Sequence, residues 1–178
     1  MSNSLDAIRA LKKGQCIAFP TEGVWGLGCD PKNEVAVLAL RSLKKRDLKK
    51  GFVLVASHLS QLKEFVDIVK HKDKMMTKWP GPHTWIVDLK EKNKFNFLGL
   101  NGLIAVRLSS HKTVKKLCSS FNGAIVATSA NYQGNKPAST EQAVRKLFPN
   151  IVIVKGNLGG HNKPSALQYL ESEEWIRR

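Results

Sequence analysis

Short apolar runs alternate with amphipathic segments along most of the chain. The runs contain β-branched or aromatic residues and are bounded by glycine, proline or polar residues, a pattern typical of buried strands. We expect strands at Cys16–Phe19, Phe52–Ala56, Thr84–Leu89, Ile104–Leu108, Ile125–Thr128 and Ile151–Val154.

Between these runs, apolar residues recur at helical spacing behind residues that commonly cap helices. The first expected helix begins at Ser4, has Leu5, Ile8 and Leu11 on one face and ends near Gly14. The others are a helix capped by Asn33 with Val35, Leu38, Ala39 and Ser42 on one face, a helix from Ser60 to about Val69, a short helix towards Trp79, and helices over Lys112–Ser119 and from Ser139 to about Leu147. The alternation predicts an α/β layered sheet, at least partly parallel, in a single domain over residues 1–178.

Glycine, proline and polar residues mark the connections. In open α/β sheets, ligands bind beyond the strand ends, where such loops converge. Four loops have a composition suited to that role: Pro20–Pro31, Leu43–Gly51, Ser129–Pro137 and Gly156–Ser165. Within the first of them, Thr21–Pro31 is expected to form a tight loop, and Lys90–Asn101 is expected to be a long one.

The composition is that of a folded protein with a strong positive charge. The 178 residues are 42% hydrophobic and 24% charged, which argues against disorder, and no apolar stretch approaches the ~18 residues of a membrane span. The N-terminus has no secretory pattern, so a cytoplasmic location is expected. Lys and Arg number 29 against 14 Asp and Glu, a formal net charge of +15, which favours a polyanionic ligand such as a nucleotide or nucleic acid.

Metal and covalent chemistry find little support. The three cysteines form no CxxC pair and are expected to be free thiols, and the five histidines form no HExxH pair, so no metal site is predicted. There is no GxxxxGK[ST] phosphate loop and no GxSxG elbow, and Gly26-Leu27-Gly28 lacks the third glycine of the dinucleotide fingerprint.

Two groups of cations remain as candidates for anion binding. The segment Lys44–Lys50 has five cations in seven residues, which fits either a phosphate site or a solvated helix C-terminus. Arg107 lies inside an apolar strand, so it needs either a structural carboxylate or an anionic ligand as partner. The polar residues of Thr128–Asn131 and Pro20–Gly23 could contact a phosphate or ribose, or only satisfy their own turns.

Taken together, these segments resemble the TsaC/YrdC family of threonylcarbamoyl-AMP synthases. Pro20–Pro31 is similar to the family's PTE-x-x-x-G-x-G loop, Lys44-Lys45-Arg46 to its KxR motif and Ser129-Ala130-Asn131 to its SxN motif. Three further segments follow in the family's order: Trp79–Thr84, Ala105-Val106-Arg107 and Lys163-Pro164-Ser165. The resemblance covers nearly the whole chain, in the short, single-domain bacterial form.

The resemblance implies a twisted, mostly parallel or mixed sheet flanked by helices, with a basic concave face. It also implies a nucleotidyltransferase reaction, in which L-threonine, bicarbonate or CO2, and ATP with Mg²⁺ give threonylcarbamoyl-AMP and pyrophosphate. The site implied has Lys44 and Arg46 as catalytic residues on the triphosphate and Ser129 and Asn131 on the nucleotide, with no protein metal ligand. Thr21, Arg107 and Ser165 would hold the threonine.

The implied product serves tRNA processing. Downstream threonylcarbamoyl-transferase proteins would use it to form threonylcarbamoyladenosine beside the anticodon, which makes them partners of this chain. The alternative that the charge leaves open is a non-catalytic protein that binds tRNA or double-stranded RNA. A carbamoyl-transfer domain like that of hydrogenase maturation factors is a further alternative, although this chain lacks the CxxC pairs of those longer proteins.

Overall fold

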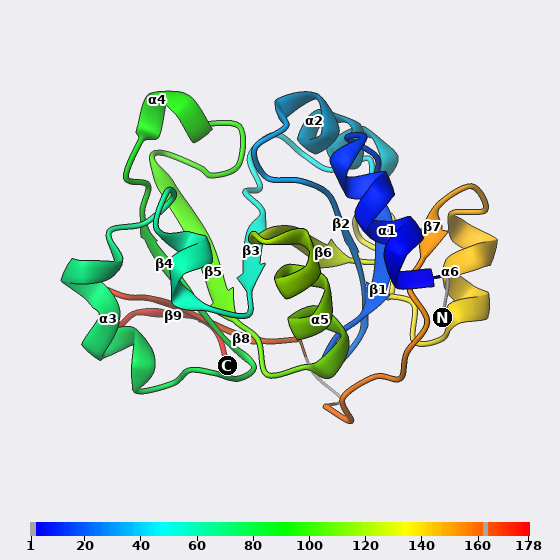
Figure 1. The fold of residues 1–178 in the computed structure, drawn as a ribbon. Coiled ribbons are helices and arrows are strands. Elements are labelled where there is room, and N and C mark those ends of the chain that lie inside the picture. Colours follow the sequence, from blue (N-terminus) through cyan, green and yellow to red (C-terminus); the bar gives the residue numbers. More distant parts are fainter. Residues whose placement is uncertain (1–2, 162–163) are drawn as a thin grey trace.

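A mixed sheet forms the centre of the computed structural model, which describes residues 3–161 and 164–178. In these residues the sheet has nine strands in the order β7-β1-β2-β6-β3-β5-β4-β8-β9 (Figure 1). The strands are β1 (Ile17–Pro20), β2 (Trp25–Gly28), β3 (Val53–Ala56), β4 (His83–Asp88), β5 (Leu103–Leu108), β6 (Ile125–Ser129), β7 (Val152–Ile153), β8 (Ala166–Tyr169) and β9 (Trp175–Arg177).

Parallel and antiparallel pairs both occur in this sheet. β1 with β7, β3 with β5 and β4 with β8 run parallel, and the other neighbouring strands are antiparallel. The prediction was a mostly parallel or mixed sheet flanked by helices, and the mixed form is confirmed, with antiparallel pairs in the majority.

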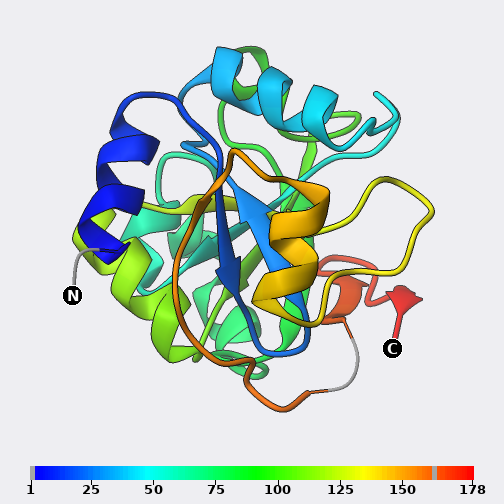
Figure 2. The ribbon, with the colours of Figure 1, turned by 90° about the vertical axis from the view of Figure 1, so that its right-hand side faces the viewer.

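Helices cover both faces of the sheet. They are α1 (Asn3–Lys12), α2 (Glu34–Leu43), a 3-10 turn η1 (Leu59–Leu62), α3 (Ile68–Met76), α4 (Lys92–Phe95), α5 (Lys112–Phe121) and α6 (Glu141–Leu147). Figure 2 shows α1 and α5 together on one side of the strands. No helix among the described residues is both long and apolar enough to cross a membrane.

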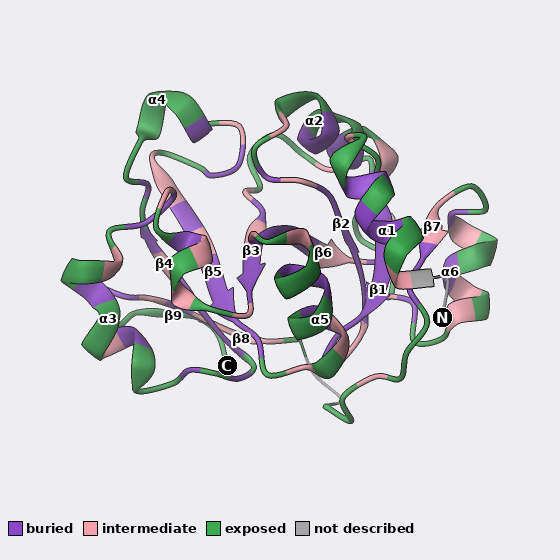
Figure 3. Ribbon diagram, viewed as in Figure 1, coloured by how far each residue is buried: buried purple, intermediate pink, exposed green. Residues whose placement is uncertain are grey.

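Two apolar clusters follow from the alternation of side chains along the strands. The smaller joins α1 and α5 to side chains such as Phe19, Val55 and Ile125, and the larger packs α2, α3 and α6 against the opposite face. The buried residues follow the strands and the inner sides of the helices (Figure 3).

Several expectations on local structure are wrong in detail. Thr21–Pro31 is not a loop throughout, because β2 lies within it and pairs with β1 as a hairpin. Gly28 is required there, since a Cβ on it would lie 2.1 Å from the Val126 carbonyl oxygen of β6. The two glycines of β2 alternate with Trp25 and Leu27, but glycine is disfavoured in strands, so local propensity favoured a loop.

The face of α2 is also different from the expected one. Asn33 caps the helix as predicted, accepting a hydrogen bond from the Ala36 N–H at 3.0 Å. The buried residues, however, are Ala36, Val37, Leu40 and Arg41, while Val35 and Leu38 are exposed. Helical spacing allowed both faces, and packing on the sheet selected the other one.

Other boundaries shift as well. The helix expected from Ser60 is only the short η1, and the main helix of that region is α3. The expected loop Lys90–Asn101 contains the short α4, and α6 is capped by Thr140 rather than Ser139. β8 and β9 had not been predicted, although they complete one edge of the sheet.

Candidate active site

A cavity of about 720 Å³ opens over the middle of the sheet. Its floor is a single row of side chains in register across five neighbouring strands: Ala127, Val53, Ala105, Ile86 and Tyr169. This row is on the same face as the cluster under α1 and α5, which covers only part of that face. The cavity over the uncovered part has the volume of a small-molecule site.

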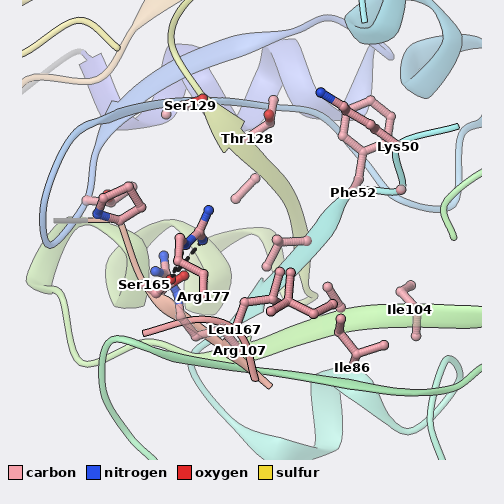
Figure 4. A pocket seen from close by; sticks show the side chains of 18 of the residues that line it. Lys50, Phe52, Ile86, Ile104, Arg107, Thr128, Ser129, Ser165, Leu167 and Arg177 are labelled. Atoms are coloured by element: carbon pink, nitrogen blue, oxygen red, sulfur yellow. Dashed lines mark hydrogen bonds between the residues drawn. The ribbon is translucent and has the colours of Figure 1, made fainter. Parts of the chain in front are cut away.

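One wall of the cavity is basic. Arg46, Lys49 and Lys50 line it, together with the Phe52 ring. Arg46 donates from Nη2 to the Gly51 carbonyl oxygen at 2.6 Å and stacks over Phe52, 5.1 Å from the ring centroid. Figure 4 shows Lys50 and Phe52 at one end of the cavity. The predicted cation cluster therefore reaches the cavity with three of its members.

A second arginine shapes this wall from behind. Arg41 of α2 donates from Nη1 to the carbonyl oxygens of Asp47 and Lys50, at 2.8 and 3.0 Å, and also lies over the Phe52 ring. Burial, with the nearby positive charge of Arg41, lowers the pKa of Arg46. Three cations gathered on one wall of a cavity favour an anionic ligand.

Lys44 does not line the cavity. Its side chain is buried, and its ammonium donates to the carbonyl oxygens of Ser129 and Asn131 and to the Asn131 Oδ1. Asn131 also accepts from the Ser129 hydroxyl at 2.6 Å. Burial of the ammonium, together with the neighbouring Arg46 guanidinium, lowers the pKa of Lys44 to about 8. Lys44 and Asn131 thus lie behind Ser129, which does line the cavity.

The β1–β2 hairpin forms another part of the lining. The Thr21 hydroxyl donates to the Val24 carbonyl oxygen at 2.7 Å, so it closes the hairpin turn while its side chain faces the cavity. Gly26 lines the cavity beside it, and its missing side chain leaves room between Thr21 and Thr128.

Arg107 has a structural carboxylate as partner. Its Nη2 lies 3.2 Å from Glu22 Oε2, and Glu22 Oε1 accepts from the Ser109 hydroxyl at 2.6 Å. Arg107 and Glu22 both line the cavity although each is more than nine-tenths buried. Burial lowers the pKa of Arg107, while the negative charge of Glu22 opposes that shift. One of the two partners left open by the sequence is therefore present in the fold.

Ser165 and Arg177 complete this end of the cavity. The Ser165 hydroxyl lies 2.8 Å from that of Thr84, and its carbonyl oxygen accepts from Nε and Nη2 of Arg177. Figure 4 places Arg107, Arg177 and Ser165 close to one another. Lys163, in the motif with Ser165, lies outside the described residues.

The fold therefore brings five predicted site residues to one cavity, namely Thr21, Arg46, Arg107, Ser129 and Ser165. Sequence reasoning missed Arg177, because β9 was not predicted, and gave no role to Glu22. The sequence did contain a signal for Glu22: it is the acidic residue of the PTE triplet, and the buried Arg107 needed a carboxylate or an anionic ligand as partner.

The thiols are unsuited to catalysis. All three cysteines are free, and Cys29 and Cys118 are buried. Burial raises the pKa of Cys16 to about 11 and that of Cys118 to about 12. None of them lines the cavity, and the described residues contain no group of three or more His, Cys, Asp or Glu that could hold a metal ion.

A cavity lined by cations and hydroxyl groups on a mixed α/β sheet has the character of a site for small anionic molecules. The Sua5/YciO/YrdC family model, described as telomere recombination, matches residues 9–178, and the chain belongs to this family. It is 40% identical over 177 residues to the threonylcarbamoyl-AMP synthase of Chromohalobacter salexigens, covering 97% of this chain and 95% of the relative. It is 37% identical to that of Vibrio vulnificus, covering 100% of this chain and 99% of the relative.

Solved structures agree on the fold. P. abyssi Sua5, in its crystal structure complexed with L-threonine, is 27% identical with a TM-score of 0.84 over 97% of this chain. This chain spans only about half of that protein, 52% of its length. Full-length HypF, in its phosphate- and nucleotide-bound form, is 17% identical with a TM-score of 0.79, so the likeness extends to the fold alone.

Proposed function

We propose that this chain is a threonylcarbamoyl-AMP synthase, an enzyme that forms threonylcarbamoyl-AMP and pyrophosphate from L-threonine, bicarbonate or CO2, and ATP. The observation that carries the proposal is the cavity itself, with Arg46, Lys49 and Lys50 at one end and Arg107 and Arg177 at the other. Full-length relatives with this name, at 37 and 40% identity, support the enzymatic interpretation over the non-catalytic RNA-binding alternative.

The chemistry suits a site without a nucleophile. The amine of threonine adds to CO2 with loss of a proton, or to bicarbonate with loss of water. An oxygen of the resulting carbamate then attacks the α-phosphorus of ATP. The bond from the α-phosphorus to the bridging oxygen breaks, and pyrophosphate leaves with the electron pair. Such a reaction needs its reactants aligned and the phosphate charge neutralised, rather than covalent help from the protein.

The triphosphate is assigned to the basic wall. Arg46 lies at the cavity surface with its guanidinium fixed by Gly51 and Phe52, so it can contact phosphate oxygens with little loss of freedom. Ser129 contacts the nucleotide beside it. Lys44 and Asn131 support Ser129 through the buried hydrogen bonds described above, and in this proposal they act on ATP through that residue.

Threonine is assigned to the opposite end. Arg107 faces its carboxylate, and Thr21 and Ser165 offer hydroxyl groups to the remaining polar atoms. Arg177 adds a positive charge there. Its Nε and Nη2 donate to the Ser165 carbonyl oxygen, and no carboxylate of the described residues is paired with it. The basic concave face expected from the sequence is part of this proposal.

ATP brings its own Mg²⁺ in this proposal. Glu22, the carboxylate of the cavity lining, is engaged by Arg107 and Ser109 and is not free to bind a cation. The metal therefore enters as part of the substrate and supplies charge neutralisation on the phosphates.

The product is a mixed anhydride, which reacts readily with a nucleophile. A second reaction must therefore transfer its threonylcarbamoyl group to an amine. We assign that acceptor to tRNA, acted on by separate transferase proteins in the cytoplasm.

The test is pyrophosphate release from ATP by the purified chain, with and without L-threonine and bicarbonate. We expect release to require both and to fall at least about hundredfold in Arg46→Ala, since charge-assisted hydrogen bonds to phosphate are lost. Lys115→Ala, an exposed lysine of α5 that does not line the cavity, serves as the matched control and should keep wild-type activity. Release that is independent of threonine would refute the proposal.

A further inference from the structure

The carboxylate beneath Arg107 has no role in the reaction outlined above. Glu22 is only 4% exposed, and its Oε2 is buried with no hydrogen-bond donor aligned to it in the described part of the chain. Its closest charged neighbour is Arg107 Nη2 at 3.2 Å. A buried charge pair contributes little net stability, so its effect on the geometry of the site is the property to test.

Glu22 is itself held from several sides. Ser109, 1% exposed, donates its hydroxyl to Oε1 at 2.6 Å and accepts from the His111 N–H at 3.1 Å. The backbone carbonyl of Glu22 accepts from the His161 N–H at 2.9 Å. Gly159 packs so closely on the Glu22 backbone that a Cβ there would lie 2.9 Å from the Glu22 Cα. These contacts hold the Glu22 carboxylate in place, so it can fix the position of the Arg107 guanidinium paired with it.

Arg107 needs such an anchor. It extends from β5, opposite Val55 in register, towards the end of the cavity where Arg177 also lies. The positive charge of Arg177 contributes to lowering the pKa of Arg107, so the two guanidinium groups repel each other. Without Glu22, Arg107 would lose the only carboxylate paired with it among the described residues and could turn away from the cavity.

We infer that Glu22 is a positioning residue for the amino-acid substrate, and that it orients the Arg107 guanidinium towards the substrate carboxylate without contacting the substrate itself. The inference rests on the proposed function, because it names how the threonine end of that site is built. Direct contact is disfavoured because Oε1 accepts from Ser109 and Oε2 is buried against Arg107. Ser109 contributes to this positioning, since its hydroxyl orients the Glu22 carboxylate.

The test compares Glu22→Gln, Arg107→Gln and the double variant in pyrophosphate release. We expect Glu22→Gln to raise the KM for L-threonine about tenfold or more, because the charge that holds the Arg107 guanidinium in a buried ion pair is removed, with the KM for ATP within about twofold of wild type. In the Arg107→Gln background, the same Glu22 substitution should change the KM for threonine less than about twofold, because the group through which it acts is gone. A structural role alone would affect both substrates and would persist in both backgrounds.

Ser109 variants keep the inference testable if Glu22→Gln does not fold. Ser109→Ala should raise the KM for threonine about threefold, and Ser109→Thr, which retains the hydroxyl, should restore it. The inference would be overturned if Glu22→Gln left the KM for threonine unchanged, or if Ser109→Ala did so where Glu22→Gln does not fold. It would also be overturned if the Glu22 substitution raised that KM as much in the Arg107→Gln background as in the wild type. Wild-type protein that folds and binds ATP but shows no threonine-dependent release refutes the proposed function, and the positioning role with it. A positioning failure alone leaves wild-type release intact.

Discussion

Removing the ammonium of Lys44 while keeping its packing is a direct test of how the nucleotide end of the site is supported. Lys44→Met keeps an unbranched side chain but deletes three donated hydrogen bonds, to the carbonyl oxygens of Ser129 and Asn131 and to the Asn131 side chain. Lys44 is 1% exposed, so water cannot replace these donors without rearrangement of the turn.

The expected magnitude follows from these contacts. Each hydrogen bond to a charged group contributes about 1.5–3 kcal/mol, and the variant also avoids the cost of burying the ammonium, so we expect a net loss of about 2–4 kcal/mol. Lys44→Ala additionally removes three buried methylene groups at about 0.8 kcal/mol each. It should therefore be about 2 kcal/mol less stable than Lys44→Met.

Equilibrium unfolding in urea, followed by the fluorescence of the buried tryptophans, gives both free energies of unfolding. A Lys44→Met variant within about 0.5 kcal/mol of wild type would refute this reasoning. If that variant also lost pyrophosphate release, Lys44 would instead contact the triphosphate directly. Equal stability of the Met and Ala variants would show that the buried stem contributes nothing to packing.

Three further outcomes are expected. Gly28→Ala should lower the free energy of unfolding, measured by heat or urea, by at least about 3 kcal/mol, because its Cβ would lie 2.1 Å from the Val126 carbonyl oxygen. Gly134→Ala is the control: it lies in open space at a φ of 88° and should lower that free energy by only about 1 kcal/mol. Cys29 should react with iodoacetamide much more slowly in the native than in the urea-unfolded protein, as measured by mass spectrometry, because it is buried and burial raises its pKa. The pKa of Lys44 falls from 10.5 to about 8 on folding, so the unfolded chain binds more protons than the folded one between these pH values. The free energy of unfolding of the wild type should therefore rise with pH in this range relative to that of Lys44→Met. A constant difference between the two free energies of unfolding would contradict this.

Local signals were sufficient for most elements. The cap at Asn33 and the apolar run Ile104–Leu108 describe their own helix and strand, because the relevant hydrogen bonds and side-chain alternation are short-range. β2 and β9 escaped prediction for the opposite reason. β2 contains Gly28, which only the neighbouring backbone requires, and β9 is a short strand stabilised by pairing with β8.

The site residues divide in the same way. The sequence motifs located Thr21, Arg46 and Ser129 near ligand-binding loops, and the structure places all three in one cavity. Their neighbours Lys44 and Asn131 have the same polar character, yet they lie behind the lining. Spacing along the chain does not distinguish these two positions, because α2 and the turn after β6 meet only in the folded protein.

The sequence by itself thus determined the alternation of strands and helices, the strong positive charge and the residue types of an anion-binding site without a nucleophile. The tertiary structure decided which face of α2 is buried, which cations reach the cavity and which partner Arg107 has. The partner is Glu22, 85 positions earlier in the chain, because β6 pairs with both β2 and β3, and β3 pairs with β5. These pairings place the turn of the β1–β2 hairpin and Arg107 of β5 in one sheet. A buried charge takes its partner from the groups that packing places around it, and those neighbours are set by the whole sheet.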